Sequence, residues 1–362
     1  SIDQFPPISA MILISHTTLN KTQPGTQNDS VAFPQMLSLY YSGRIAPHIG
    51  SFLQVSYDAQ SDHFGFDMAD LRYANSTTLW KRSLTWGVTL DNIPTFDDPW
   101  NSTPGEGFPF VGSDSAPGPG ATPVIMSLGG NVLGLGAYGW YNNSIYAGVS
   151  VYRSAQIGAS QPLDSSATEV ISNVAPYWRL AWEHNWSSGN YTNSWEIGTF
   201  GMSAHLFPGG GQALAGATDD YLDTAVDSQY QLMTPNRSSL TARATFIHEK
   251  QTLNASDPTQ RDNHLNTLML SAQYYWWEKF GPSIAYFNTT GSTNAALYGS
   301  QTASPDSNGW LLQWTYLPAQ NVQLGVQYTL YNKFDGAGSN YDGTGRSASD
   351  NDTLYLFAWL MF

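Results

Sequence analysis

The sequence predicts an all-β protein, a transmembrane antiparallel β-barrel of sixteen strands, and three observations support this prediction. Segments with an apolar residue at every second position recur along the chain, as in strands with one apolar face. The connections between these segments alternate in length. The last segment, residues 352–362, alternates up to its final residue, and its unpaired edge would invite aggregation unless another strand covered it. Closure removes that edge and satisfies every backbone polar group inside a bilayer.

The closing segment is expected to pair with residues 6–18. One face of it carries Leu354, Leu356, Ala358, Leu360 and Phe362, and the other carries Tyr355, Phe357, Trp359 and Met361. Alternating apolar residues before a terminal phenylalanine also resemble the assembly signal of bacterial outer-membrane β-barrel proteins. The alternative is an apolar core strand of a soluble β-sandwich.

The composition fits a barrel wall in a membrane. Charged residues make up 12% of the chain, against about 25% in ordinary globular domains, and aromatic residues reach 14%. This ratio suits aromatic girdles at two membrane interfaces. The absence of cysteine excludes disulfides, thiolate metal sites and covalently attached haem c within these residues. A formal net charge of −14 argues against a nucleic-acid partner.

The same alternation recurs along the chain and predicts where each strand lies. In the clearest case, residues 322–331, Leu324 and Val326 alternate with polar Gln323 and Gln327. The predicted strands are 6–18, 31–43, 46–58, 62–73, 80–92, 130–142, 144–154, 173–186, 190–204, 219–233, 237–249, 263–276, 280–288, 308–317, 321–332 and 352–362. Strand 62–73 changes parity along its length, which predicts a β-bulge between Asp67 and Ala69.

The connections predict how the barrel is oriented. Long or variable segments follow odd-numbered strands, and tight turns such as Ser42-Gly43-Arg44 and Asn142-Asn143 follow even-numbered ones. Short periplasmic turns and long extracellular loops are expected of an outer-membrane barrel, so both termini are predicted to be periplasmic. Residues 1–362 then form one barrel domain in the bacterial outer membrane. The first residues lack the features of a signal peptide, so we expect the mature chain after its removal.

The longest connection, residues 93–129, is the first candidate functional element. Connections of this length are usually functional or disordered. Its aromatic residues favour packing against a surface, and an inward fold would narrow the lumen and bring negative charge to it. The predicted constriction residues are Asp97, Asp98, Trp100, Glu106, Phe108 and Phe110. The alternative is an extracellular cap or a loop that docks a partner.

Ionisable residues on the water-facing parity of the strands are the second candidate. The predicted lumen-wall charges are Asp70, Arg72, Arg179, Glu183, Arg243 and Glu249, and Asp58 and Glu196 share the pattern. Charges inside a barrel wall line hydrated pathways and set ion preference, or they form structural ion pairs between neighbouring strands. The seven histidines have no metal-ligand spacing, and no nucleophile constellation points to an enzyme, so neither catalytic nor metal-binding residues are predicted.

Several segments resemble the barrel portion of outer-membrane cytochrome–porin fusions of the iron-oxidase type. The similar segments are Pro6 to Ala10, Ser38 to Gly43 leading to Pro47 to Gly50, Asp62 to Phe64 leading to Asp70 to Ala74, Gly87 to Asn92 with Trp100 to Pro104, Ala175 to Leu180, and Phe246 to Glu249.

The resemblance implies a sheath for an electron-transfer conduit that carries electrons inward from extracellular Fe(II). The family's Cys-x-x-Cys-His haem motif is missing here, so haem c is expected only in a missing segment or in a separate c-type cytochrome. The alternative function is a passive diffusion porin for small hydrophilic solutes or ions, since a sixteen-stranded lumen is wide enough for them. Outer-membrane lipid surrounds the barrel in either case, and the sequence does not determine the oligomeric state.

Overall fold

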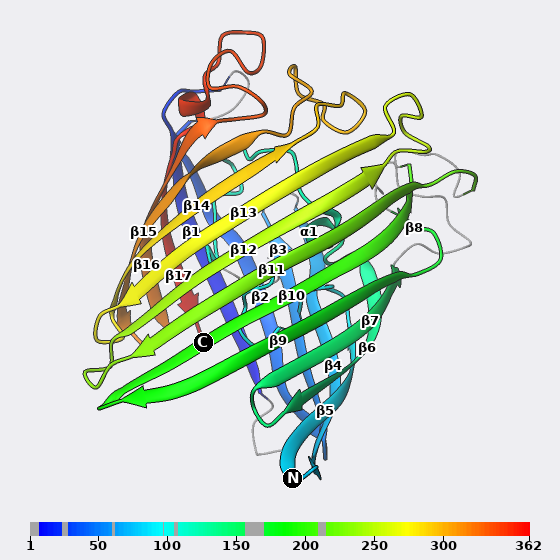
Figure 1. Ribbon diagram of the computed structural model, residues 1–362. Helices are drawn as coiled ribbons and strands as arrows, with labels where there is room; N and C mark the ends of the chain where they lie inside the picture. Colours follow the sequence, from blue (N-terminus) through cyan, green and yellow to red (C-terminus); the bar gives the residue numbers. More distant parts are fainter. Residues whose placement is uncertain are drawn as a thin grey trace.

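A computed structural model describes residues 7–23, 28–59, 62–96, 98–104, 108–155, 170–208 and 215–362 (Figure 1). Its strands are β1 (Ile8–Leu19), β2 (Ser30–Ala46), β3 (Ile49–Asp58), β4 (His63–Leu79), β5 (Arg82–Asp91), β6 (Val132–Tyr141), β7 (Ile145–Ser154), β8 (Val170–Ile171), β9 (Ala175–Ser188), β10 (Tyr191–Phe207), β11 (Asp219–Met233), β12 (Ser239–Thr252), β13 (Asp262–Tyr275), β14 (Phe280–Gly291), β15 (Ser307–Ala319), β16 (Val322–Lys333) and β17 (Thr353–Met361). Two short helices are α1 (Val124–Ser127) and the 3₁₀ helix η1 (Ala348–Asn351).

The strands form one closed antiparallel barrel. Each strand pairs with the next except at the short β8, where β7 pairs with β9 instead, and β1 pairs with β17 from Met11 opposite Met361 to Leu19 opposite Thr353. This register confirms the predicted pairing of residues 6–18 with 352–362. The two-residue β8 pairs with the end of β10, whose earlier residues pair with β9. Strands β8 and β9 therefore share one position in the wall, and the described residues form a barrel of sixteen strand positions.

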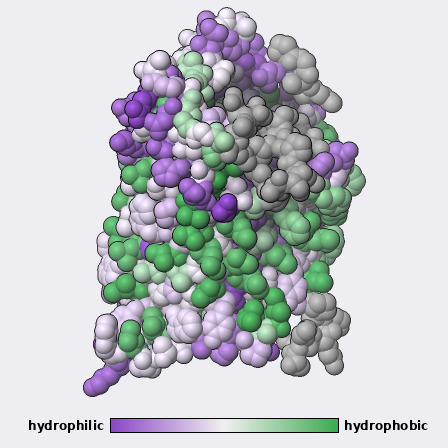
Figure 2. Space-filling model, turned by 90° about the vertical axis from the view of Figure 1, so that its right-hand side faces the viewer, coloured by the Kyte–Doolittle hydropathy of each residue, from purple (hydrophilic) through white to green (hydrophobic). Residues whose placement is uncertain are grey.

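The wall separates an apolar outside from a mostly polar inside. On β16, Leu324 and Val326 face outward and are 41% and 47% exposed. Gln327 on the same strand faces inward and is 4% exposed. Figure 2 shows hydrophobic residues gathered over the wall of one face, below a polar loop end. Exposed aromatic residues lie beside the short turns, among them Trp80, Trp186, Tyr191, Trp276, Trp277 and Tyr316. Among the described residues, no helix is long and apolar enough to cross a membrane.

The predicted alternation of connections is confirmed, although one turn is displaced. Long connections lie at one end of the barrel, and the start of β1 and the end of β17 lie near the other, where the turns are short (Figure 1). Asn142 and Asn143 have φ values of 53° and 49°, as a tight hairpin turn requires. The predicted turn at residues 42–44 is wrong, because these residues pair with Phe52, Ser51 and Gly50 of β3 and the chain turns at residues 47–48.

Gly43 explains that error, because close packing rather than a turn requires a glycine there. A Cβ atom at Gly43 would lie 2.3 Å from Cγ of Pro7, whose carbonyl oxygen accepts a hydrogen bond from Ser42 N. By contrast, the predicted bulge in β4 is confirmed. Gln54 pairs with Met68 and Val55 with Phe66, so Asp67 is the extra residue of the bulge.

We expect Phe362→Asp to reduce the amount of assembled barrel while hardly changing the stability of barrels that do fold. The Phe362 side chain is 65% exposed, and its backbone N–H and C=O bond to Ala10 in either case. A charge at a membrane interface costs about 0–1 kcal/mol, so a large loss would reflect impaired recognition during assembly. The measurements are outer-membrane protein levels and the thermal unfolding of purified barrels. Trp80→Asp, at an 82% exposed turn residue, is the control, and equal levels of the two variants would contradict the expectation.

Candidate functional site

The connection between β5 and β6, residues 92–131, enters the barrel, and we call it the inner loop. Its backbone carbonyls accept hydrogen bonds from side chains on widely separated strands of the wall. Thr245 of β12 donates to Ser102 O at 2.6 Å, Gln327 of β16 donates to Val111 O at 3.1 Å, and Gln35 of β2 donates to Gly112 O at 2.8 Å. The loop therefore runs across the interior from one side of the wall to the other.

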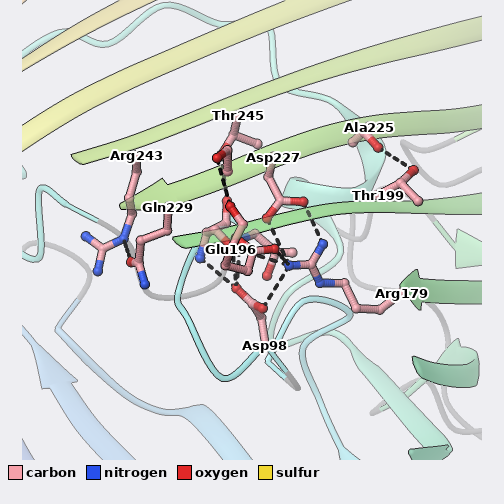
Figure 3. Close-up of polar contacts among 12 residues, drawn as sticks. Asp98, Arg179, Glu196, Thr199, Ala225, Asp227, Gln229, Arg243 and Thr245 are labelled. Carbon is pink, nitrogen blue, oxygen red and sulfur yellow. Dashed lines mark hydrogen bonds and ion pairs between the residues drawn. The ribbon is translucent and has the colours of Figure 1, made fainter. Parts of the chain in front are cut away.

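A buried ion cluster forms the first anchor of the inner loop (Figure 3). The guanidinium of Arg179, on β9, lies 3.1 Å from Oδ1 of Asp98 in the loop. It also lies 2.9 Å from Oε1 of Glu196 on β10 and 2.6 Å from Oδ1 of Asp227 on β11. All four side chains are at most 1% exposed. Because Arg179 is on β9 and two of its carboxylate partners are on β10 and β11, a single cation ties the loop to three neighbouring strands.

Asp98 also shapes the loop around this anchor. Its Oδ2 accepts hydrogen bonds from Ser102 N, Ser102 Oγ and Thr103 N at 2.6, 3.0 and 3.0 Å. One carboxylate thus closes a tight segment of the loop with one oxygen and holds Arg179 with the other. Trp100 lies beside the cluster, with its ring centroid 5.7 Å from Cζ of Arg179, so the guanidinium has a cation–π contact as well.

A glycine on β10 makes room for the guanidinium. A Cβ atom at Gly198 would lie 2.1 Å from Nη1 of Arg179. No side chain larger than hydrogen fits without displacing the guanidinium, so the position of Arg179 depends on this residue type.

The second anchor holds α1 within the inner loop. Val124 N donates to Oε2 of Glu249 at 2.6 Å, and Ile125 N donates to Oδ2 of Asp223 at 2.8 Å. These two carboxylates are opposite one another on β11 and β12 and are each 1% exposed. The side chains that α1 contributes then pack into an apolar core inside the barrel. That core includes Val124, Ile125, Leu128, Val132, Tyr152, Phe200, Met202 and Ile247.

The predicted constriction residues fall into three groups. Asp98 and Trp100 are buried, at 7% and 6% exposure for the whole residue, and belong to the first anchor. Phe108 and Phe110 form an edge-to-face pair with centroids 6.5 Å apart, and Phe110 is 43% exposed. Asp97 and Glu106 lie outside the described residues.

The predicted wall charges are distributed around the interior. Asp70 and Arg72 form an ion pair at 3.1 Å, and Glu183 accepts a hydrogen bond from Ser194 at 2.8 Å. Arg243 is half-buried and donates to the amide oxygens of Gln229 and Gln273 at 2.6 and 3.1 Å, as Figure 3 shows for Gln229. Arg179 and Glu249 belong to the two anchors.

Sequence reasoning missed two anchoring carboxylates, Asp223 and Asp227. The sequence does contain a signal for them, because on β11 they alternate with outward-facing Leu222 and Val226, which are 41% and 56% exposed. Within the described ranges, no group of three or more His, Asp or Glu side chains is placed to hold a metal ion. The interior is therefore organised by carboxylates, guanidinium groups and amides.

Arg179→Gln is expected to destabilise the barrel by about 3–5 kcal/mol, because removing the cation leaves buried carboxylates without their partner. The inner loop should also become a better substrate for proteases once its anchor is lost. The measurements are the thermal unfolding of the purified barrel and the rate of cleavage within residues 93–129. Arg72→Gln is the control, since that side chain is 28% exposed and a partly solvated ion pair contributes about 1 kcal/mol or less. Similar losses for both variants would argue against Arg179 as an anchor.

Gly198→Ala should reproduce part of this effect without removing any charge, because its methyl group would displace the guanidinium. Gly139→Ala is the matched control, since a Cβ atom there would lie 3.5 Å from Cδ1 of Leu84, an ordinary contact. Unfolding temperature and loop cleavage are measured as before. A Gly198→Ala protein as stable as the Gly139→Ala protein would show that the guanidinium position is not fixed by this contact.

No protein-family model and no curated protein matches the sequence. Solved structures with a similar fold include OmpF of Salmonella typhi in complex with daunomycin, at 14% identity over 98% of this chain and 97% of that chain, with a TM-score of 0.55. An anion-selective porin from Comamonas acidovorans is similar at 11% identity over 98% of both chains, with a TM-score of 0.53. The outer-membrane channel DcaP of Acinetobacter baumannii follows at 12% identity over 98% of this chain and 96% of that chain, with a TM-score of 0.51. The chain therefore has the closed sixteen-strand barrel fold of bacterial outer-membrane porins, which fits an outer-membrane location.

Proposed function

We propose that this protein is a passive channel of the outer membrane, which admits small hydrophilic solutes and ions and favours cations. The observation that carries the proposal is the inner loop, which crosses the lumen and is fixed to opposite sides of the wall. A loop held in this way narrows the lumen and leaves part of it open. Short turns and both termini then face the periplasm, and the long connections face the outside.

The charge of the interior supports the cation preference. Outside the two anchors, the carboxylates of the wall and the inner loop include Asp67, Asp70, Asp91, Asp114 and Glu183. The guanidinium groups that face the interior from the strands are Arg72, Arg179 and Arg243. Arg179 alone is surrounded by three carboxylates, so it does not offset the excess. The anion-selective porin from Comamonas acidovorans has a similar fold, but an acidic interior predicts the opposite preference here.

A sheath for an electron-transfer conduit of the Fe(II)-oxidation type is the second candidate, and it rests on the sequence resemblance to cytochrome–porin fusions. A haem-bearing segment inside the barrel would have to share the lumen with the inner loop, which is fixed to the wall at two anchors. A haem absorbance band in the purified native protein, or a c-type cytochrome that copurifies with it, would support the conduit over the passive channel.

The passive channel is tested by planar-bilayer conductance across a gradient of potassium chloride. We expect open-channel current with a reversal potential that favours potassium. Replacing residues 108–119 by a short Gly-Ser linker should raise the single-channel conductance, because this part of the loop crosses the lumen while both anchors remain.

The matched control is the same kind of replacement at residues 256–260, a mostly exposed segment between β12 and β13. It should leave the conductance unchanged. Equal conductance of the two loop variants and the unmodified protein would contradict a constricting role for the inner loop, and a reversal potential that favours chloride would contradict the cation preference.

A further inference from the structure

A cavity of about 430 Å³ lies between the inner loop and the wall formed by β1, β2, β3, β4 and β17. We call it the chamber. Its volume falls in the range of about 300–1,000 Å³ that is usual for small-molecule sites. Three separate parts of the inner loop contribute to it, at Ile93, at residues 110–114 and at Gly129. The inference below rests on the proposed channel function and concerns the kind of solute that the chamber binds.

Part of the chamber is apolar, unlike most of the interior wall. Met11, Met36 and Met68 contribute thioether side chains from three strands, and Trp359 and Phe110 contribute aromatic rings. Methionine adapts its shape to different ligands and makes favourable contacts with aromatic rings. An apolar surface of this kind inside an aqueous channel favours a solute with a hydrocarbon or aromatic body.

The charges in the chamber are negative. Asp67 and Asp114 are in its lining, which contains no Lys, Arg or His. All 14 Lys and Arg residues of the sequence lie in described ranges, so no cation of the chain is placed to neutralise these carboxylates within the chamber. The β-bulge of β4 supplies Asp67, which accepts a hydrogen bond from Nε2 of Gln54 at 3.0 Å and is half-buried. Asp114 is exposed.

Two side chains of the chamber wall have polar atoms without a partner among the described residues. Because Nε2 of Gln54 donates to Asp67, its Oε1 points away from that bond, and it has no donor. Nε1 of Trp359 has no acceptor. Both atoms are buried, and a buried polar atom without a partner is costly. A bound molecule that carries N–H groups would donate to Oε1 of Gln54 after small side-chain adjustments.

We propose that the chamber binds small primary amines with an aromatic or branched alkyl body, in their ammonium form. The ammonium group donates hydrogen bonds to Asp67 and Asp114, where charge assistance strengthens them. The apolar body lies against the methionines and the ring of Trp359, which also attracts the cation through its π face. The bulge in β4 and the path of the inner loop together build this site, since they bring the two carboxylates to one cavity.

The test uses the full chain in detergent, with 2-phenylethylamine as the probe and isothermal titration calorimetry as the readout. Binding should be saturable at one site per chain. It should be at least about tenfold weaker for 2-phenylethanol, which lacks the charge, for 3-phenylpropionate, which reverses it, and for ethylamine, which lacks the ring. Asp67→Asn and Asp114→Asn should each weaken amine binding about tenfold, whereas Glu278→Gln, at a turn residue with a 65% exposed side chain, should not change it.

The same probe is then added to single channels in a planar bilayer, where it should block potassium current in wild-type protein and less in Asp114→Asn. Because calorimetry does not require conduction, the test of amine binding in the chamber is independent of the test of the channel function. Binding without any channel current would support the chamber and overturn the channel function. Current without amine binding, equal binding of phenylethanol, or unchanged binding in both aspartate variants would overturn the chamber.

Discussion

The constraint on which the structure depends is that every backbone polar group of the wall needs a partner within the protein, because the bilayer core offers no water. Pairing of β1 with β17 meets this need without any help from the interior. Strand pairing therefore places no requirement on the side chains inside the barrel. The interior holds polar side chains, an apolar core and a loop of the chain itself, none of which is needed to close the sheet.

The inner loop meets a second constraint, since a long connection inside the barrel brings its own backbone groups with it. Wall side chains satisfy several of them, as Gln35 does for Gly112 O and Glu249 for Val124 N. The ion cluster fixes the position of the loop as well, because Arg179 can reach Asp98 only while Gly198 leaves space beside it. Charges buried in this way are costly to separate, and so they hold the loop in one place.

The alternation of residues was sufficient to predict the wall but not the contacts within it. Parity identified Arg179 and Glu196 as interior residues. The parity change in β4 predicted a bulge between Asp67 and Ala69, and the structure has it at Asp67. Which carboxylate meets Arg179 depends on the stagger of the strands and on the path of the loop, and neither has a local signal in the sequence. The predicted turn at Gly43 is wrong for a related reason. In the sequence, a glycine required by close packing against the distant Pro7 looks the same as a glycine required by a turn.

The inner loop divides the interior into two unlike parts. Towards β9 to β12, residues of α1 pack against Phe200, Met202 and Ile247, and the anchors occupy the space beside them. Towards β1 to β4 and β17, Gln35 and Thr17 bond to the loop, and the chamber lies between the loop and the wall. In the proposed channel, solutes would meet the side of the barrel where the wall carries methionines and carboxylates rather than the side where Arg179 is buried. Barrels with the same fold can host different functions, and on our proposal the path of the inner loop, rather than the strands that enclose it, would set which solutes this barrel admits.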